Sequence, residues 1–269
     1  MIIDSHVHIG NICKFDMPEN MVLESMKKYN IDFSLISNIE GAEFDCEQKI
    51  IKQELAHSQY EVNIKAIEFA KANKDKIGVL LWGRPSNEGC NEEFEKMIVD
   101  NKDVVYGIKI HPYHSKISFD SKEVERYIKL ADKYGLPVLT HTASDENSDC
   151  ENVYKMAEKY PNVNFIMGHM GLGTDNKRAI ELIKKLNNLY GDTAWVEPGH
   201  AIEMIKKCGS NKLLFGTDNP IDGVDTYSHP TVCSIYLGNE FRSKLSREDY
   251  ENVMFKNAIR LFNLKIDNA

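Results

Sequence analysis

The sequence has no long apolar run and no basic leader segment. None of its apolar stretches approaches the roughly 18 residues that a membrane-spanning helix needs. Its first residues lack the basic segment and following apolar run of a secretory signal. We therefore expect a soluble cytoplasmic protein without a membrane partner.

Paired cysteines are also missing. The six cysteines form no CxxC pair and are widely spaced, at Cys13, Cys46, Cys90, Cys150, Cys208 and Cys233. This pattern argues against a zinc knuckle and against a disulfide framework, and it is typical of reduced thiols in a cytosolic protein.

Positive charge is in deficit as well. The chain has 33 lysines and arginines against 41 aspartates and glutamates, which gives a formal net charge of −8. General nucleic-acid binders and proteins that bind anionic membranes need a basic surface, so neither partner is expected. A small-molecule substrate fits this charge balance, and a homo-oligomer stays open.

The 269 residues contain short apolar runs that alternate with helical patterns. Eight runs are predicted as strands: Ile2–His8, Asp32–Asn38, Ile77–Trp82, Val104–His111, Pro137–Thr142, Val163–His169, Thr193–Glu197 and Lys212–Asp218. Eight patterns are predicted as helices: Glu19–Tyr29, Glu61–Ala72, Glu92–Val99, Lys122–Tyr134, Glu151–Tyr160, Lys177–Tyr190, Ile202–Lys207 and Arg247–Phe262. Eight βα units of this length predict an α/β fold, a single (β/α)8 TIM barrel over residues 1–269. The longest loops, 39–60 and 219–246, should cover its active face.

Histidines and one aspartate gather where the predicted strands end. His6 and His8 end the first strand, His141 the fifth and His169 the sixth, while Asp218 closes the eighth. In a barrel these ends converge on one mouth, and residues i and i+2 of a strand share a face. Imidazoles and a carboxylate at one point suit Zn²⁺ or a similar divalent ion. Three further histidines follow strands and are interpreted as exposed loop residues: His114, His200 and His229.

These motifs, in this order, resemble the amidohydrolase superfamily of metal-dependent barrels, in particular its amidohydrolase 2 branch. The segments that carry the resemblance are His6-Val7-His8, Thr140-His141-Thr142, Gly168-His169-Met170 and Gly216-Thr217-Asp218-Asn219-Pro220, with Asn257–Phe262 near the end of the chain. The resemblance covers almost the whole chain. It implies one or two divalent ions, Zn²⁺ favoured, held by His6, His8, His141 and Asp218.

The same resemblance implies roles for the catalytic residues. The metal would lower the pKa of bound water to about 7, and Asp218 would act as general base and then return the proton to the leaving group. His169 would stabilise an oxyanion, act as acid–base, or bind a second ion.

Three other residues are candidates for contact with the substrate. Lys109 lies on the fourth strand in a position that resembles the lysine of dihydroorotase-like relatives, which implies either a carbamylated bridge between two metals or an amine that binds an anionic group. His111 ends the same strand and is either a substrate contact or a structural residue. Arg84 follows the third strand and is either a bidentate clamp on a substrate carboxylate or an exposed loop residue.

The favoured function is therefore a metal-dependent hydrolase that acts on a small amide, lactone or cyclic carbonyl compound. A metal-dependent decarboxylase or related lyase is the alternative, because it shares every motif above. A TatD-like deoxyribonuclease fits less well, because the net charge is acidic and that subfamily has a glutamate on strand four where this chain has Lys109 and His111. A barrel that binds metal without turnover would not need the proton-shuttling Asp218.

Overall fold

The computed structural model describes residues 1–229 and 233–266. Nine strands occur in this part of the chain: β1 (Ile3–Ile12), β2 (Phe15–Met17), β3 (Phe33–Asn38), β4 (Ile77–Trp82), β5 (Val105–Ile110), β6 (Val138–Ala143), β7 (Phe165–Leu172), β8 (Leu189–Asp192) and β9 (Leu213–Leu214). The α-helices are α1 (Glu19–Tyr29), α2 (Gln59–Ala72), α3 (Glu92–Asp100), α4 (Pro112–Ser115), α5 (Lys122–Tyr134), α6 (Cys150–Lys159), α7 (Lys177–Ile183), α8 (Pro198–Cys208), α9 (Ser234–Leu237), α10 (Asn239–Ser243), α11 (Arg247–Glu251) and α12 (Asn257–Phe262).

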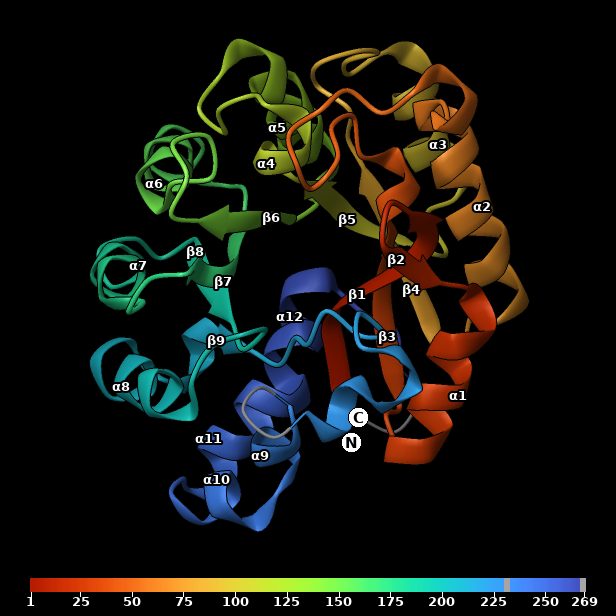
Figure 1. Cartoon of the computed structure of the whole chain (residues 1–269). Helices are drawn as coiled ribbons and strands as arrows, with labels where there is room; N and C mark the ends of the chain where they lie inside the picture. Colours follow the sequence, from red (N-terminus) through yellow and green to blue (C-terminus); the bar gives the residue numbers. More distant parts are fainter. Residues whose placement is uncertain (230–232, 267–269) are drawn as a thin grey trace.

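The strands form one sheet in the order β2-β1-β3-β4-β5-β6-β7-β8-β9, in which only the β1–β2 pair is antiparallel. Backbone hydrogen bonds between β1 and the segment after β9 close this sheet into a barrel: Ser5 N–H donates to Phe215 O at 2.9 Å, and Asp218 N–H donates to His6 O at 2.8 Å. The helices surround the strands (Figure 1). The predicted single-domain TIM barrel is confirmed.

The barrel interior is apolar at one end and polar at the other. One buried apolar cluster fills the end of the barrel at which the strands begin. It contains Ile3, Leu80, Leu139 and Leu214, which pack with helix α12. Polar side chains follow further along the same strands, toward their carboxyl ends. On β6, Leu139 and His141 are two residues apart and so share a face. The packed apolar side chains therefore hold the strands in place, and with them the polar side chains nearer the carboxyl ends.

Three predicted elements differ most from the structure, and one is the eighth strand, which was predicted as Lys212–Asp218 and is present as β9 over Leu213–Leu214. The seventh barrel strand is β8, Leu189–Asp192, whereas Thr193–Glu197 is the loop that follows it. The predicted helix Lys177–Tyr190 ends as α7 at Ile183. Gly191 and Asp192 weaken the strand signal of β8, because both residue types are depleted in strands. Ala194 and Val196 in this loop are buried by packing, not by sheet pairing.

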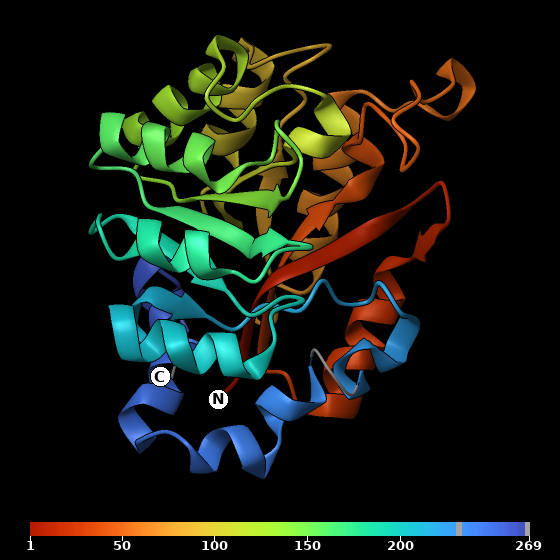
Figure 2. The same cartoon turned by 60° about the vertical axis from the view of Figure 1, so that its left-hand side comes forward.

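The carboxyl ends of the strands carry the longer connections. The β1–β2 hairpin extends past the barrel on this side (Figure 2). Ile39 and Ile221, from the two longest predicted loops, line the cavity at the mouth. In the described part of the chain, no helix combines the length and apolarity needed to cross a bilayer.

Candidate metal centre

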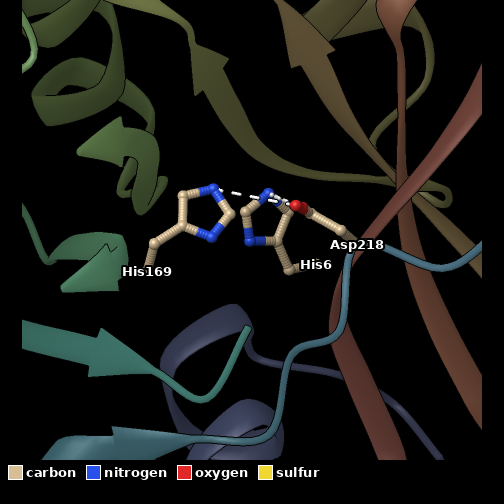
Figure 3. Close-up of side chains that lie close together, drawn as sticks. All are labelled: His6, His169 and Asp218. Carbon is tan, nitrogen blue, oxygen red and sulfur yellow. Dashed lines mark ion pairs between the residues drawn. The ribbon is translucent and has the colours of Figure 1, made fainter. Parts of the chain in front are cut away.

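Three buried side chains meet at the carboxyl ends of the strands: His6 from β1, His169 from β7, and Asp218 from the segment after β9. One ligand atom from each lies within 4.8 Å of the others. His6 Nε2 is 3.0 Å from Asp218 Oδ1, and His169 Nε2 is 3.8 Å from Asp218 Oδ2. Figure 3 shows both imidazole rings beside this carboxylate. The predicted convergence of residues from the first, sixth and eighth strands is present.

His8 joins the cluster from the same strand as His6. Its Nε2 lies 3.4 Å from Asp218 Oδ1, and its Nδ1 lies 3.0 Å from Ser37 Oγ. The predicted arrangement of these two histidines on one face of the first strand therefore agrees with the structure.

His141 stands beside the cluster on β6. Its ring centroid is 4.8 Å from that of His169, and its ring stacks on His111 at 4.1 Å with an interplanar angle of 12°. His111 in turn stacks on Trp82 at 5.6 Å. The orientation of His141 is thus fixed by a stack of rings from three neighbouring strands.

Lys109 is completely buried, with its Nζ 2.6 Å from His6 Nε2. Burial lowers the pKa of Lys109 to about 8, against the opposing effect of the Asp218 and Asp192 carboxylates. The inward orientation predicted for this lysine is therefore present. His111 lines the cavity, and its Nδ1 accepts the N–H of His114 at the start of α4.

Arg84 lies apart from this group. Its guanidinium donates to Glu88 and to the backbone oxygen of His57, and the residue is not part of the cavity wall. Arg84 therefore links two loops through these contacts and does not reach the cluster.

The electrostatic balance of the cluster favours a cation. Burial raises the pKa of Asp218, but the nearby charges of His6 and His169 outweigh burial and hold it well below its usual range. Burial lowers the pKa of His8 to about 4 and also lowers the pKa of His169. Burial and the charge of Lys109 lower the pKa of His6, but the Asp218 and Asp192 carboxylates outweigh them and raise it. Imidazoles beside an ionised carboxylate are a donor set that divalent ions bind once each ligand nitrogen has lost its hydrogen.

One atom tests directly whether a metal fits. Asp218 Oδ1 is buried and receives no well-directed hydrogen bond, although His6 Nε2 lies 3.0 Å away. A buried carboxylate oxygen without a donor is costly, and a bound cation would satisfy it. The residues present therefore fit a divalent metal.

Three of the ten described non-glycine residues with a positive φ lie at this centre. His169, Trp195 and Asp218 have φ values of 68°, 57° and 63°. This left-handed region is unfavourable for residues with a Cβ, and such strain persists only where the surroundings enforce it. The strain is typical of a functional site.

Sequence reasoning missed three residues near the cluster. Trp195 donates its indole N–H to Asp218 Oδ2 at 2.8 Å, and Asp192 accepts from His6 and His169. His114, interpreted as exposed, is 8% exposed, and its Nδ1 lies 2.7 Å from Phe44 O. Asp192 lies just before the predicted seventh strand and Trp195 lies inside it, so their inward position could not be deduced from its predicted bounds.

A cavity of about 760 Å³ opens over the cluster. Its wall includes His8, His141, His169 and Asp218, together with Phe15, Tyr113 and Trp195, and charged groups at Lys14, Asp145 and Asp222. A second cavity, of about 730 Å³, is lined by Phe33, Tyr106 and Phe262 and has no histidine in its wall.

A closed parallel barrel with buried imidazoles and a carboxylate at its carboxyl end defines a class, the metal-dependent TIM-barrel enzymes. Within this class the chain belongs to the amidohydrolase family, because the profile of the amidohydrolase 2 family matches residues 3–264. No curated protein sequence matches the chain significantly.

Solved structures share the fold at low identity. An amidohydrolase II protein is 18% identical, with a TM-score of 0.69, over 98% of this chain and 100% of its own. A 2,6-dihydroxybenzoate decarboxylase from Rhizobium is 14% identical, with a TM-score of 0.67, over 97% and 98%. A 5-carboxyvanillate decarboxylase from Novosphingobium aromaticivorans, solved with manganese, is 11% identical, with a TM-score of 0.71, over 98% and 97%.

Proposed function

We propose that the protein is a metal-dependent hydrolase that cleaves a small amide, lactone or cyclic carbonyl compound. One or two divalent ions, Zn²⁺ favoured, would be held by His6, His8, His141 and Asp218, with His169 at the same centre. Imidazole-rich sites suit Zn²⁺, whereas manganese, which two of the similar decarboxylase structures contain, prefers oxygen ligands.

The charges on the cavity wall favour hydrolysis over decarboxylation. No arginine is among the described residues of this wall, and its charged groups outside the cluster are one ammonium, Lys14, and two carboxylates, Asp145 and Asp222. A decarboxylase must bind a substrate carboxylate, for which arginine is the usual bidentate partner. A neutral carbonyl substrate fits the wall better.

Asp218 would act as the proton acceptor. Its depressed pKa keeps it ionised at neutral pH, and Trp195 holds Oδ2 in place. When bound, the ion supplies polarisation of the substrate carbonyl and activation of a water molecule. Asp218 would take the proton of that water and deliver it to the leaving group.

His169 would be a ligand or a second proton acceptor. Its Nδ1 lies 3.1 Å from Ala194 O. Because a carbonyl oxygen only accepts hydrogen bonds, Nδ1 carries the hydrogen and Nε2 of the neutral ring presents a lone pair to the cluster. A neutral His169 is therefore not a donor to an oxyanion.

Decarboxylation is the second candidate function, supported by the fold that the chain shares with the named decarboxylases. The test is a screen of metal-loaded protein against paired panels of neutral amides or lactones and aromatic carboxylates, with hydrolysis and CO₂ release scored separately. Hydrolysis of a neutral compound is the expected result. CO₂ release without hydrolysis would replace the proposal with the second candidate, and elemental analysis that finds no divalent metal in folded protein would refute both.

A further inference from the structure

Asp192, at the end of β8, is fully buried behind the metal centre. Its Oδ2 lies 2.7 Å from His6 Nδ1. Its Oδ1 accepts the backbone N–H of His169 at 2.8 Å and that of Ala194 at 3.2 Å. One carboxylate thus contacts two of the three clustered residues from the side away from Asp218.

The contact with His6 determines which ring nitrogen is available. A carboxylate oxygen accepts hydrogen bonds, so His6 Nδ1, which lies next to it, carries a hydrogen. The other nitrogen, Nε2, is then the one that can lose its hydrogen, and it lies 3.0 Å from Asp218 Oδ1 and 2.6 Å from Lys109 Nζ. A metal ion binds only an unprotonated nitrogen. This hydrogen bond therefore selects the tautomer that can be a ligand.

The contact with His169 acts on the backbone. His169 adopts a left-handed φ of 68°, and the bond from its N–H to Asp192 Oδ1 holds the peptide in that conformation. The ring is held separately, because its Nδ1 donates to the carbonyl oxygen of Ala194. Ala194 is itself bonded to Asp192 through its N–H. Asp192 therefore supports His169 by two routes.

We propose that Asp192 is a positioning residue of the metal centre. It fixes the ring orientation and tautomer of His6 and the backbone of His169, so that the Nε2 atoms of both face one divalent ion. Hydrogen bonds of this kind from a carboxylate to a ligand histidine raise metal affinity. This inference rests on the metal centre of the proposed function, and it holds for hydrolysis and decarboxylation alike.

Asp192→Asn is the discriminating variant, because asparagine keeps the shape of aspartate. Its amide has only one acceptor atom, so the NH₂ group must face either His6 Nδ1 or the His169 N–H. The first orientation reverses the His6 tautomer, and the second places two donors against each other. Asp192→Ala removes both contacts. Glu43→Gln is the matched control, because Glu43 is a buried carboxylate that also accepts two backbone N–H groups, from Ser86 and Asn87.

The experiment measures Co²⁺ affinity by competition with a chelator, together with the Co²⁺ absorption spectrum. We expect affinity to fall about 10–100-fold in Asp192→Asn and Asp192→Ala, with an altered spectrum, while Glu43→Gln binds like the wild type. Circular dichroism confirms folding of each variant. If the Asp192 variants fold and bind Co²⁺ with wild-type affinity, the inference about Asp192 is wrong, whereas the proposed function still stands.

A measurement on the unaltered protein covers the case in which the variants do not fold. Nitrogen-15 NMR of the metal-free wild type, at a pH high enough for the His6 ring to be neutral, should show its hydrogen on Nδ1. An unprotonated Nδ1 would overturn the inference whatever the variants do. Wild-type protein that binds no Co²⁺ would instead overturn the metal centre, and with it the proposed function.

Discussion

The indole N–H of Trp195 donates to Asp218 Oδ2 at 2.8 Å, while Asp218 Oδ1 points to His6 and His8. The two oxygens of one carboxylate thus have separate environments. One is bound by the protein, and the other is directed at the histidines. This separation suits a residue that must serve both as a ligand and as a proton carrier.

Removal of the indole donor should impair this division. In Trp195→Phe, Oδ2 loses a hydrogen bond to a charged group, which contributes about 1.5–3 kcal/mol. We expect kcat/KM to fall at least about tenfold, with the metal still bound. Steady-state kinetics and elemental analysis test this, and unchanged kcat/KM would show that Trp195 only fills space.

Histidine deletions should separate the ligands from their neighbours. We expect His6→Ala to abolish metal binding and His141→Ala to lower the metal content of purified protein without unfolding the barrel. His57→Ala is the control, because His57 is an exposed loop residue. Metal is quantified by elemental analysis and folding by circular dichroism. Wild-type metal content in His141→Ala would remove that residue from the ligand set.

Lys109→Met tests the two roles of the buried lysine. Methionine keeps most of the length and loses the charge that lies beside His6 Nε2. If the amine is unmodified and supports catalysis through its contact with His6, turnover should fall about tenfold or more while metal content stays the same, and this is the result we expect. A fall from two equivalents of metal to one would instead assign Lys109 to a carbamylated bridge.

The pH dependence of stability should reveal Glu43. Burial raises its pKa to about 7, against opposing hydrogen bonds from Ser86 and Asn87 and the charge of Arg84. The folded state therefore keeps the proton that the unfolded state releases near its ordinary pKa of 4.5. Stability from this group is present below that value and is lost as the pH rises to 7.

Glu43→Gln abolishes this titration. The difference in unfolding free energy, wild type minus variant, should therefore decrease by about 2–3 kcal/mol between pH 4.5 and pH 8. Urea titrations at several pH values measure it, with Glu47→Gln, at an exposed and ion-paired glutamate, as control. A difference that does not vary with pH would contradict the raised pKa.

The sequence was most informative where strand pattern and chemistry coincide. His6, His8, His141, His169 and Asp218 each close a clear apolar run, so barrel topology alone predicts that they converge. Lys109 follows from strand parity for the same reason. Arg84 shows the limit, because a loop side chain is directed by its local partners, here Glu88 and His57, which no pattern along the chain reveals.

The seventh strand shows a second limit. β8 has four residues and contains Gly191 and Asp192, whereas the following loop has the more strand-like composition. Asp192 is placed by pairing of β8 with β7 and β9, which depends on distant parts of the chain. Asp192, which we infer to position the metal centre, could therefore not be found from the sequence, because the strand that carries it was predicted at the wrong residues.

The closure of the barrel between its first and last strands has a consequence for folding during synthesis. Ser5 and Phe215, which form one bond of this closure, are 210 residues apart. The ribosome therefore synthesises His6 long before Asp218, and the barrel cannot close until its last strand has been made. A metal ion held by both His6 and Asp218 would therefore bind only after most of the chain has been made, and a chain truncated before Asp218 would lack one of the proposed ligands.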